Sequence, residues 1–327
     1  MRKSQKLGNP AFAPTLTAPA TYAGEASSDY IAAALLSAKT LDQGNIEIHP
    51  NVKYKEVIQK IDVGSIVNDA SCNFESTGSV AISEVVLEPK ELQVNLELCK
   101  QNFLDSWEAI SMGYSAFDEI PRNFTDYLIS YVGGKVAEAT EQSIWDGQNT
   151  NGNFEGFVEK LAAASGSADS PTMAQSGSVD YPSVPLTSTN FLDILQAVYD
   201  AIPSAVYGKD DLVIYLSTKG MKLWQQSQSG QVNVGSFNSQ LNVGEKPTNF
   251  QGIELVHAPG LVASENVIIA AQKSNLHFGT GLLSDYNEVR VLDMADIDGS
   301  QNFRVIMRYT AGTAVGINNE VTAYGLV

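Results

Sequence analysis

The clearest pattern of hydrophobic and polar positions lies in residues 122–146, where apolar side chains recur at every fourth position. The stripe consists of Phe124, Leu128, Val132, Val136 and Ile144, with Tyr127 and Tyr131 beside it. Asp126, Lys135, Glu138, Glu141 and Gln142 fall off the stripe. This spacing predicts one amphipathic helix, with Pro121 at its start and Gly147 after its last turn. At a rise of about 1.5 Å per residue the helix would be about 37 Å long.

Two features of this segment raise the question of a ligand site. Gly133 and Gly134 lie inside the helical pattern, where each costs about 1 kcal/mol relative to Ala, and we expect them to serve close packing or a bend. An EF-hand loop beginning at Asp146 would need ligands at positions taken by Gln148 and Thr150, Gly where Asn151 stands, and Glu where Phe157 stands. The pattern fails, so the sequence predicts a turn after a long helix.

Residues 80–99 form a predicted β region, in which the run ELQVNLELC alternates so that Leu92, Val94, Leu96 and Leu98 share one face. Residues 51–63 are rich in β-branched side chains, and the polar stretch 64–79 separates the two regions. We therefore expect one long hairpin over 51–99, whose ten-residue arms would project about 33 Å. A lone hairpin of that length is not stable in water, which predicts a surface for it to lie on.

The rest of the chain divides into an arm, a linker, an α/β region and a closing β region. We expect an extended arm over 1–50 with a short helix at 28–39, and a Ser/Gly/Pro-rich linker over 162–190. The α/β region has predicted helices at 191–202 and 218–228 and predicted strands at 211–217, 252–257 and 266–271. Strands at 288–294 and 302–317 flank an Asp298–Gly299 turn, with bends or bulges expected at Gly312 and Gly316.

The composition and net charge limit the kinds of molecule that the protein is expected to bind. The chain has 327 residues, 43% of them hydrophobic, room for about two domains and no apolar run long enough to cross a bilayer. The net charge of −17 predicts a surface that repels nucleic acid, with one local basic cluster at Arg2, Lys3 and Lys6. Cys72 and Cys99 make no disulfide framework, and reduced thiols are favoured over a pair.

No motif for catalysis or cofactor binding emerges. The Gly133–Lys135 segment lacks the spacing of a phosphate loop, and residues 278–284 have Ser284 in place of the third glycine of a dinucleotide fingerprint. A second calcium-like pattern near Asp298 has Met294 at its first ligand position. The three histidines, His49, His257 and His277, are far apart in sequence, which disfavours zinc. We assign no catalytic, cofactor-binding or metal residue and expect a structural protein without cofactors.

Four segments together resemble the major capsid proteins of tailed bacteriophages with the Hong Kong 97-type fold, including those of crAss-like and other Bacteroidetes-infecting phages. They are YAGE at 22–25, the region 51–109 with NVKYKEVIQKID and VVLEPKELQVNLELCKQNFLDSWEA, the helix and turn at 121–157, and NLHFGTGLLSDYNEVRVLD at 275–293. The resemblance rests on the order and spacing of these segments over most of the chain.

The resemblance implies an α+β capsid fold with an N-terminal arm (1–50), an extended β-hairpin loop (51–99) and an α/β axial domain (190–275). A peripheral domain would combine 100–189, including a spine helix at 122–146, with 276–317, and 318–327 would be a C-terminal tail. It also implies pentamers and hexamers that form an icosahedral head, with non-specific contact to packaged double-stranded DNA and no membrane contact. The protein would occur in the virion, and in the host cytoplasm before assembly, with portal and decoration proteins as further partners.

Two points depart from the resemblance. The short arm has no coiled-coil extension, so a separate scaffold is expected. Lys53, Lys55 and Lys60 near the loop, and Asn318, Asn319 and Glu320 late in the chain, match no crosslinking motif, so a noncovalent shell is expected. The alternatives are an encapsulin-like cellular compartment, an extracellular adhesion or carbohydrate-binding protein, and an enzyme that uses carboxylates for acid and base chemistry.

Overall fold

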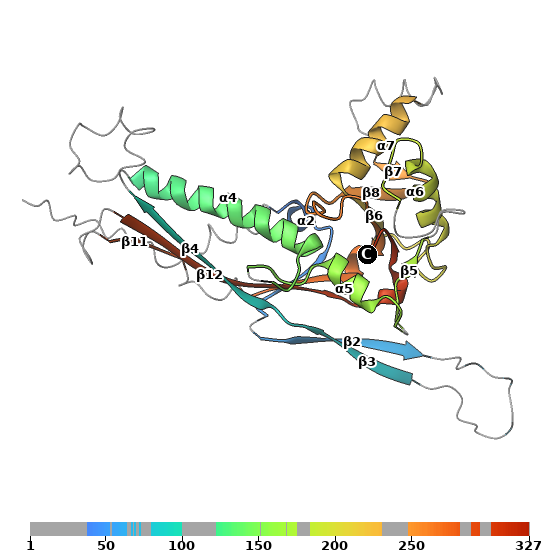
Figure 1. Ribbon diagram of the computed structural model, residues 1–327. Helices are drawn as coiled ribbons and strands as arrows, with labels where there is room; N and C mark the ends of the chain where they lie inside the picture. Colours follow the sequence, from blue (N-terminus) through green and yellow to red (C-terminus); the bar gives the residue numbers. More distant parts are fainter. Residues whose placement is uncertain are drawn as a thin grey trace, which may run out of the picture.

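The structure is a computed structural model that describes residues 38–52, 54–63, 67, 69, 72, 80–99, 122–150, 152–167, 169–174, 184–230, 248–281, 289–294 and 302–326. Figure 1 shows an elongated part, in which helix α4 lies along a set of long strands, joined to a compact α/β part. Strands β2 and β3 form a separate two-stranded hairpin, drawn below the other elements in this view. None of the described helices is long and apolar enough to cross a membrane.

The elongated part is built on one long strand, β12 (Asn302–Val315). Residues Asn302–Ala311 of β12 pair antiparallel with the whole of β4, and the other edge of β12 pairs antiparallel first with β11 and then with β10. A short strand, β1, runs parallel to β10 at the outer edge. The other strands of this sheet are β1 (Glu47–Pro50), β4 (Lys90–Cys99), β10 (Leu276–Thr280) and β11 (Val289–Asp293), of which all but β1 pair with β12.

The compact part holds a six-stranded sheet in the order β5-β13-β9-β6-β8-β7. Its central strands β6 and β9 are buried along their whole length because both faces are covered. Helices α6 and α7 cover one face, and Trp145 of α4 packs on Tyr215 at the other, with ring centroids 4.9 Å apart. The bounds are α6 (Phe191–Asp200), α7 (Thr218–Gly230), β5 (Thr172–Met173), β6 (Leu212–Leu216), β7 (Asn249–Phe250), β8 (Ile253–His257), β9 (Ile268–Gln272) and β13 (Thr322–Tyr324).

Helix α4 (Arg122–Asp146) has the predicted bounds. Val132, Val136 and Ile144 of the predicted stripe are buried, and the side chains of Phe124 and Leu128 lie outside the described residues. Glu141 was wrongly expected among the residues off the buried stripe, and it is only 6% exposed. Its carboxylate accepts hydrogen bonds from the backbone N–H and the hydroxyl of Thr40, so it holds the short helix α2 (Lys39–Asp42) against α4.

The predicted hairpin differs from the observed one in its second arm. Strands β2 (Glu56–Val63) and β3 (Val80–Leu87) pair antiparallel, which confirms a hairpin here. The strand is interrupted at Glu88–Pro89, and β4 then pairs with β12 in place of the hairpin. The alternating Leu92–Leu98 segment is therefore part of the main sheet. Pro89 has no N–H with which to continue a ladder, so it separates the two strands.

Several expected connections are regular structure. Residues 38–50 of the expected arm hold α2 and β1, and Leu41 and Ile46 are in the core. The expected linker at 162–190 overlaps α5 (Phe157–Ala164) and holds β5. The expected tail at 318–327 holds η2 (Asn318–Glu320) and β13, which is buried between β5 and β9. These pieces are short and gain stability from distant partners, so local sequence patterns do not reveal them. A further 3₁₀ turn, η1, spans Lys273–Asn275.

Candidate functional site

The hairpin carries an apolar stripe on its outer face. Val57 lies opposite Val86, and Ile61 lies opposite Ile82, in the antiparallel register of β2 and β3. Ile61 and Ile82 are each 63% exposed, and the two valines are nearly half exposed. The Gln59–Glu84 pair separates the two apolar pairs on this face. A soluble protein rarely leaves such a grouped apolar surface open without a partner, so the stripe indicates a contact surface.

The inner face of the hairpin is anchored to the body near its root. Ile58 and Val85 face each other across the strands and pack against a small core of Val52, Leu87 and Ala314. Leu87 is fully buried. One face of the hairpin therefore packs on the chain's own sheet, while the opposite face is exposed and available for contact with another molecule.

Two glycines allow this close approach of the hairpin root. A Cβ atom on Gly279 of β10 would lie 2.8 Å from the Leu87 side chain. A Cβ atom on Gly312 of β12 would lie 2.9 Å from the backbone of Glu88 and Pro89. The expected bend at Gly312 is wrong, because β12 continues through it to Val315. Gly312 is needed instead because the backbone of Glu88 and Pro89 passes directly over it.

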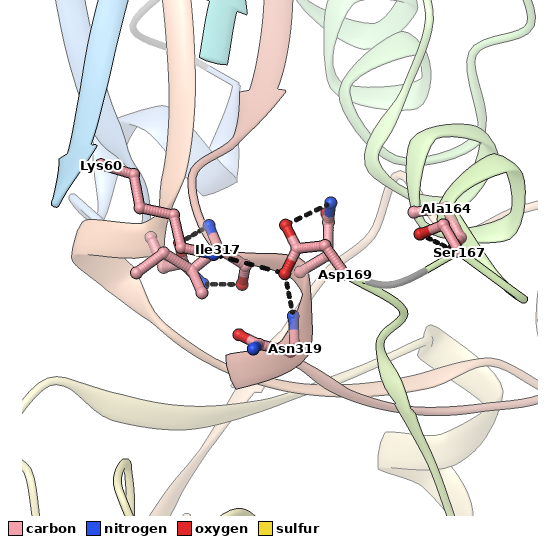
Figure 2. Close-up of polar contacts among 8 residues, drawn as sticks. Lys60, Ala164, Ser167, Asp169, Ile317 and Asn319 are labelled. Carbon is pink, nitrogen blue, oxygen red and sulfur yellow. Dashed lines mark hydrogen bonds and ion pairs between the residues drawn. The ribbon is translucent and has the colours of Figure 1, made fainter. Parts of the chain in front are cut away.

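A polar clamp on Asp169 links the hairpin to the chain before β5 and after β12 (Figure 2). The Lys60 ammonium on β2 lies 3.4 Å from Asp169 Oδ1, and the backbone N–H of Asn319 donates to the same oxygen at 3.3 Å. The Asn318 side chain donates to Asp169 Oδ2 at 3.5 Å. Of the residues considered for a covalent crosslink, Lys60, Asn318 and Asn319 meet at this carboxylate, whereas Lys55 pairs with Glu88 and Lys53 lies outside the described residues.

A groove of about 320 Å³ lies beneath the hairpin. Val85 and Val86 of β3 line one side, and Glu159, Lys160 and Ala163 of α5 line the other. Its lining mixes charged and apolar side chains without a grouped set of nucleophile and base.

The Gly/Asn loop after α4 binds the ammonium group of a lysine side chain of the same protein. The Lys90 ammonium donates to Asn149 Oδ1 at 3.1 Å, to the carbonyl of Thr150 at 2.9 Å and to the carbonyl of Asn153 at 2.8 Å. The loop therefore fixes the start of β4 relative to the end of α4. This arrangement supports the prediction of a turn over that of a ligand site.

The two adjacent glycines of α4 have different surroundings. Gly133 is buried, in keeping with close packing, whereas a Cβ atom on Gly134 would meet nothing within 4 Å. The helix is continuous through both. The burial of Gly133 agrees with close packing, whereas the open space at Gly134 does not.

The remaining sequence candidates are scattered. Cys72 and Cys99 are both free thiols, the first exposed and the second at the end of β4. His257 contacts Thr218 at 3.0 Å, far along the sequence from the other two histidines. His49 and His277 lie together, with His49 Nε2 3.0 Å from His277 Nδ1, a proximity that their 228-residue separation in sequence concealed. Arg2, Lys3, Lys6, the helix at 28–39 and the Asp298–Gly299 turn lie outside the described residues.

The chain is similar over most of its length to several solved structures from phages and capsid particles. The chain is similar to the capsid of a native GTA particle, with 14% identity, a TM-score of 0.61 and coverage of 89% of each chain. It is also similar to the satellite phage P4 procapsid, with 12% identity, a TM-score of 0.58 and coverage of 92% of this chain and 90% of that one.

A third similar structure, from Gordonia phage Cozz, has 14% identity, a TM-score of 0.54 and coverage of 88% and 86%. No protein-family profile and no curated protein matches the sequence. These likenesses cover both the long-stranded sheet and the compact α/β part. The chain therefore has the α+β fold of phage capsid proteins of the Hong Kong 97 type.

Proposed function

We propose that the chain is the major capsid protein of a tailed phage and that it assembles into the pentamers and hexamers of an icosahedral head. The observation that carries the proposal is the projecting hairpin, which is anchored on one face and leaves the Ile61–Ile82 pair open on the other. The likeness in fold to phage capsids, over 89% of both chains in the comparison with the GTA capsid, supports it.

Each part of the fold then has a role in the shell. The β2–β3 hairpin is the extended loop and lies on a neighbouring subunit, α4 is the spine helix, and the long-stranded sheet around β12 forms the peripheral domain. The six-stranded sheet with α6 and α7 forms the axial domain. Because β5 and β13 belong to this sheet, the axial domain includes residues on both sides of the 190–275 segment.

The partners follow from this role. The head encloses double-stranded DNA, and the net charge of −17 limits how strongly the shell holds phosphates. A separate scaffold, a portal and decoration proteins are the further partners, the shell is noncovalent, and the protein is not an enzyme. The virion is its final location, after synthesis in the host cytoplasm, and the crAss-like group is the proposed origin.

Electron microscopy of the purified protein, alone and with a co-expressed scaffold from the same phage, tests the proposal. Capsomers, sheets or closed shells are the expected products. A monodisperse monomer in both conditions would contradict it and would favour an adhesion or carbohydrate-binding protein. Nucleic acid inside the particles isolated from infected cells separates a phage head from an encapsulin-like compartment, which encloses proteins.

A further inference from the structure

Three potential metal ligands converge at the edge of the long-stranded sheet. The parallel pairing of β1 with β10 places Glu47 opposite His277, and His49 is two residues further along β1 on the same face. His49 Nε2 lies 3.0 Å from His277 Nδ1, and Glu47 Oε2 lies 3.4 Å from the same His277 nitrogen. Among the described residues, this is the one group of three such side chains whose ligand atoms all lie within 4.8 Å of one another.

A fourth residue fixes the orientation of the His49 ring. His49 Nδ1 lies 3.1 Å from Glu56 Oε1, at the first residue of β2. A carboxylate there accepts the Nδ1 proton, so the Nε2 lone pair of His49 points towards His277. A carboxylate behind a histidine is also the usual outer partner of a metal-binding imidazole, because it fixes the tautomer and increases the basicity of the ligand nitrogen.

The second ring, His277, would bind a metal through Nδ1, the nitrogen that faces His49 and Glu47. Burial lowers the pKa of His277, although the nearby carboxylates of Glu47 and Glu56 act in the opposite direction. Without a metal, His277 Nδ1 donates its proton to the His49 Nε2 lone pair, so metal binding requires that the His277 proton reside on Nε2 instead. A Cβ atom on Gly316 would lie 3.1 Å from that Nε2, so the glycine leaves room beside it.

We propose that Glu47, His49 and His277 bind a zinc-type divalent cation, with Glu56 as the outer partner of His49. Zinc–nitrogen bonds of about 2.0–2.1 Å at a tetrahedral angle place two ligand nitrogens about 3.3 Å apart, a few tenths of an ångström more than the observed separation. Two imidazoles and one carboxylate suit zinc and its neighbours in the first transition row, whereas magnesium and calcium prefer oxygen ligands alone. A water molecule completes the fourth position.

The site connects three segments that meet at the hairpin root. Glu47 and His49 are on β1, His277 is on β10, and Glu56 begins β2. A bound cation therefore braces the edge strand β1 against the sheet and, through Glu56, braces the base of the hairpin. The site needs only one chain, so metal binding and shell assembly are tested independently.

The test uses untagged full-length protein in a Cys72→Ser/Cys99→Ser background, so that thiols contribute no zinc ligand. After treatment with a chelator, zinc binding is measured by isothermal titration calorimetry, and bound zinc per chain is measured by mass spectrometry after gel filtration. We expect one zinc ion per chain, a rise in the melting temperature with zinc, and visible absorption from a tetrahedral complex when cobalt replaces zinc.

Variants identify the ligands. His49→Ala and His277→Ala should each abolish stoichiometric binding, and Glu56→Gln should weaken it about tenfold to hundredfold. His257→Gln removes the remaining histidine and should bind zinc like the parent. His277 is buried, so the His277→Ala variant could misfold. In that case His49→Ala and Glu47→Gln test the zinc site, because both residues are on the edge strand β1. The proposal is overturned if the parent binds no zinc at 100 µM or so, or if folded His49→Ala binds it as tightly as the parent.

Discussion

Replacing the two exposed isoleucines of the hairpin should separate subunit stability from assembly. In the Ile61→Thr/Ile82→Thr variant, the β-branched shape that suits a strand is kept and the apolar surface is reduced. Both side chains are already 63% exposed in the isolated subunit. Their loss should therefore change the free energy of unfolding by no more than about 1 kcal/mol, the upper range for one cross-strand pair.

The expected effect on assembly is much larger. Full burial of an isoleucine side chain contributes about 1.5–3 kcal/mol. With 63% of each side chain still exposed, covering both by a neighbouring subunit contributes about 2–4 kcal/mol per subunit. At about 1.4 kcal/mol for each factor of ten, the concentration needed for assembly should rise about 30-fold to 700-fold.

The assay is sedimentation velocity or light scattering over a concentration series, with urea unfolding of the unassembled subunit measured in parallel. Gln59→Thr is the matched control, because Gln59 lies on the same face between the two apolar pairs and its replacement removes no apolar contact. Assembly of the double variant at the parent's concentration would refute the assignment of the stripe as an intersubunit surface, as would an equal effect from Gln59→Thr.

Four further predictions concern other parts of the chain. Gly134→Ala should stabilise the subunit by about 0.5–1 kcal/mol in urea unfolding, because the new Cβ meets open space; a loss of stability would contradict this explanation. Gly312→Ala should destabilise it by about 1–3 kcal/mol, because the Cβ would press on the Glu88–Pro89 backbone, and unchanged unfolding would show that this backbone moves freely. Deleting residues 66–77 should leave the subunit folded by circular dichroism but abolish shells in electron microscopy; normal shells would rule out the extended-loop assignment. Burial lowers the pKa of His277, so the unfolded state binds more protons just below the ordinary histidine value of about 6.5, and metal-free protein should lose stability as the pH falls through that value. His277→Gln should reduce this loss in urea unfolding between pH 7.5 and 5.5, and an unchanged slope would exclude His277 as its source.

Elements with a strong local pattern could be predicted from the sequence. Helix α4 has a long apolar stripe and a start and stop signal, and its bounds agree with the prediction. The all-apolar strand β6 and the flanking helices α6 and α7 were also predicted within a few residues. By contrast, β1 and β13 are three or four residues long and are strands only because they pair with β10 and β9, which no local pattern records.

The candidate sites depended still more on the fold. Glu141 has the spacing of a surface residue, and its burial follows from a partner, Thr40, that is 101 residues away. The spacing of the histidines argued against zinc because it reflects sequence separation, whereas the parallel β1–β10 pairing brings His49 and His277 into contact. The sequence did indicate that the hairpin needs a partner surface, but only the register shows which of its faces is free.

The position of β13 in its sheet has a consequence for synthesis on the ribosome. Residues 322–324 lie between β5 and β9, so the strands at 172–173 and 268–272 stay separated until that segment has left the exit tunnel. Both edges of the gap are then unpaired, and the buried β9 is an aggregation risk for as long as the gap is open. A nascent chain stalled before residue 322 therefore has an incomplete sheet, which makes truncated chains targets for chaperones and proteases.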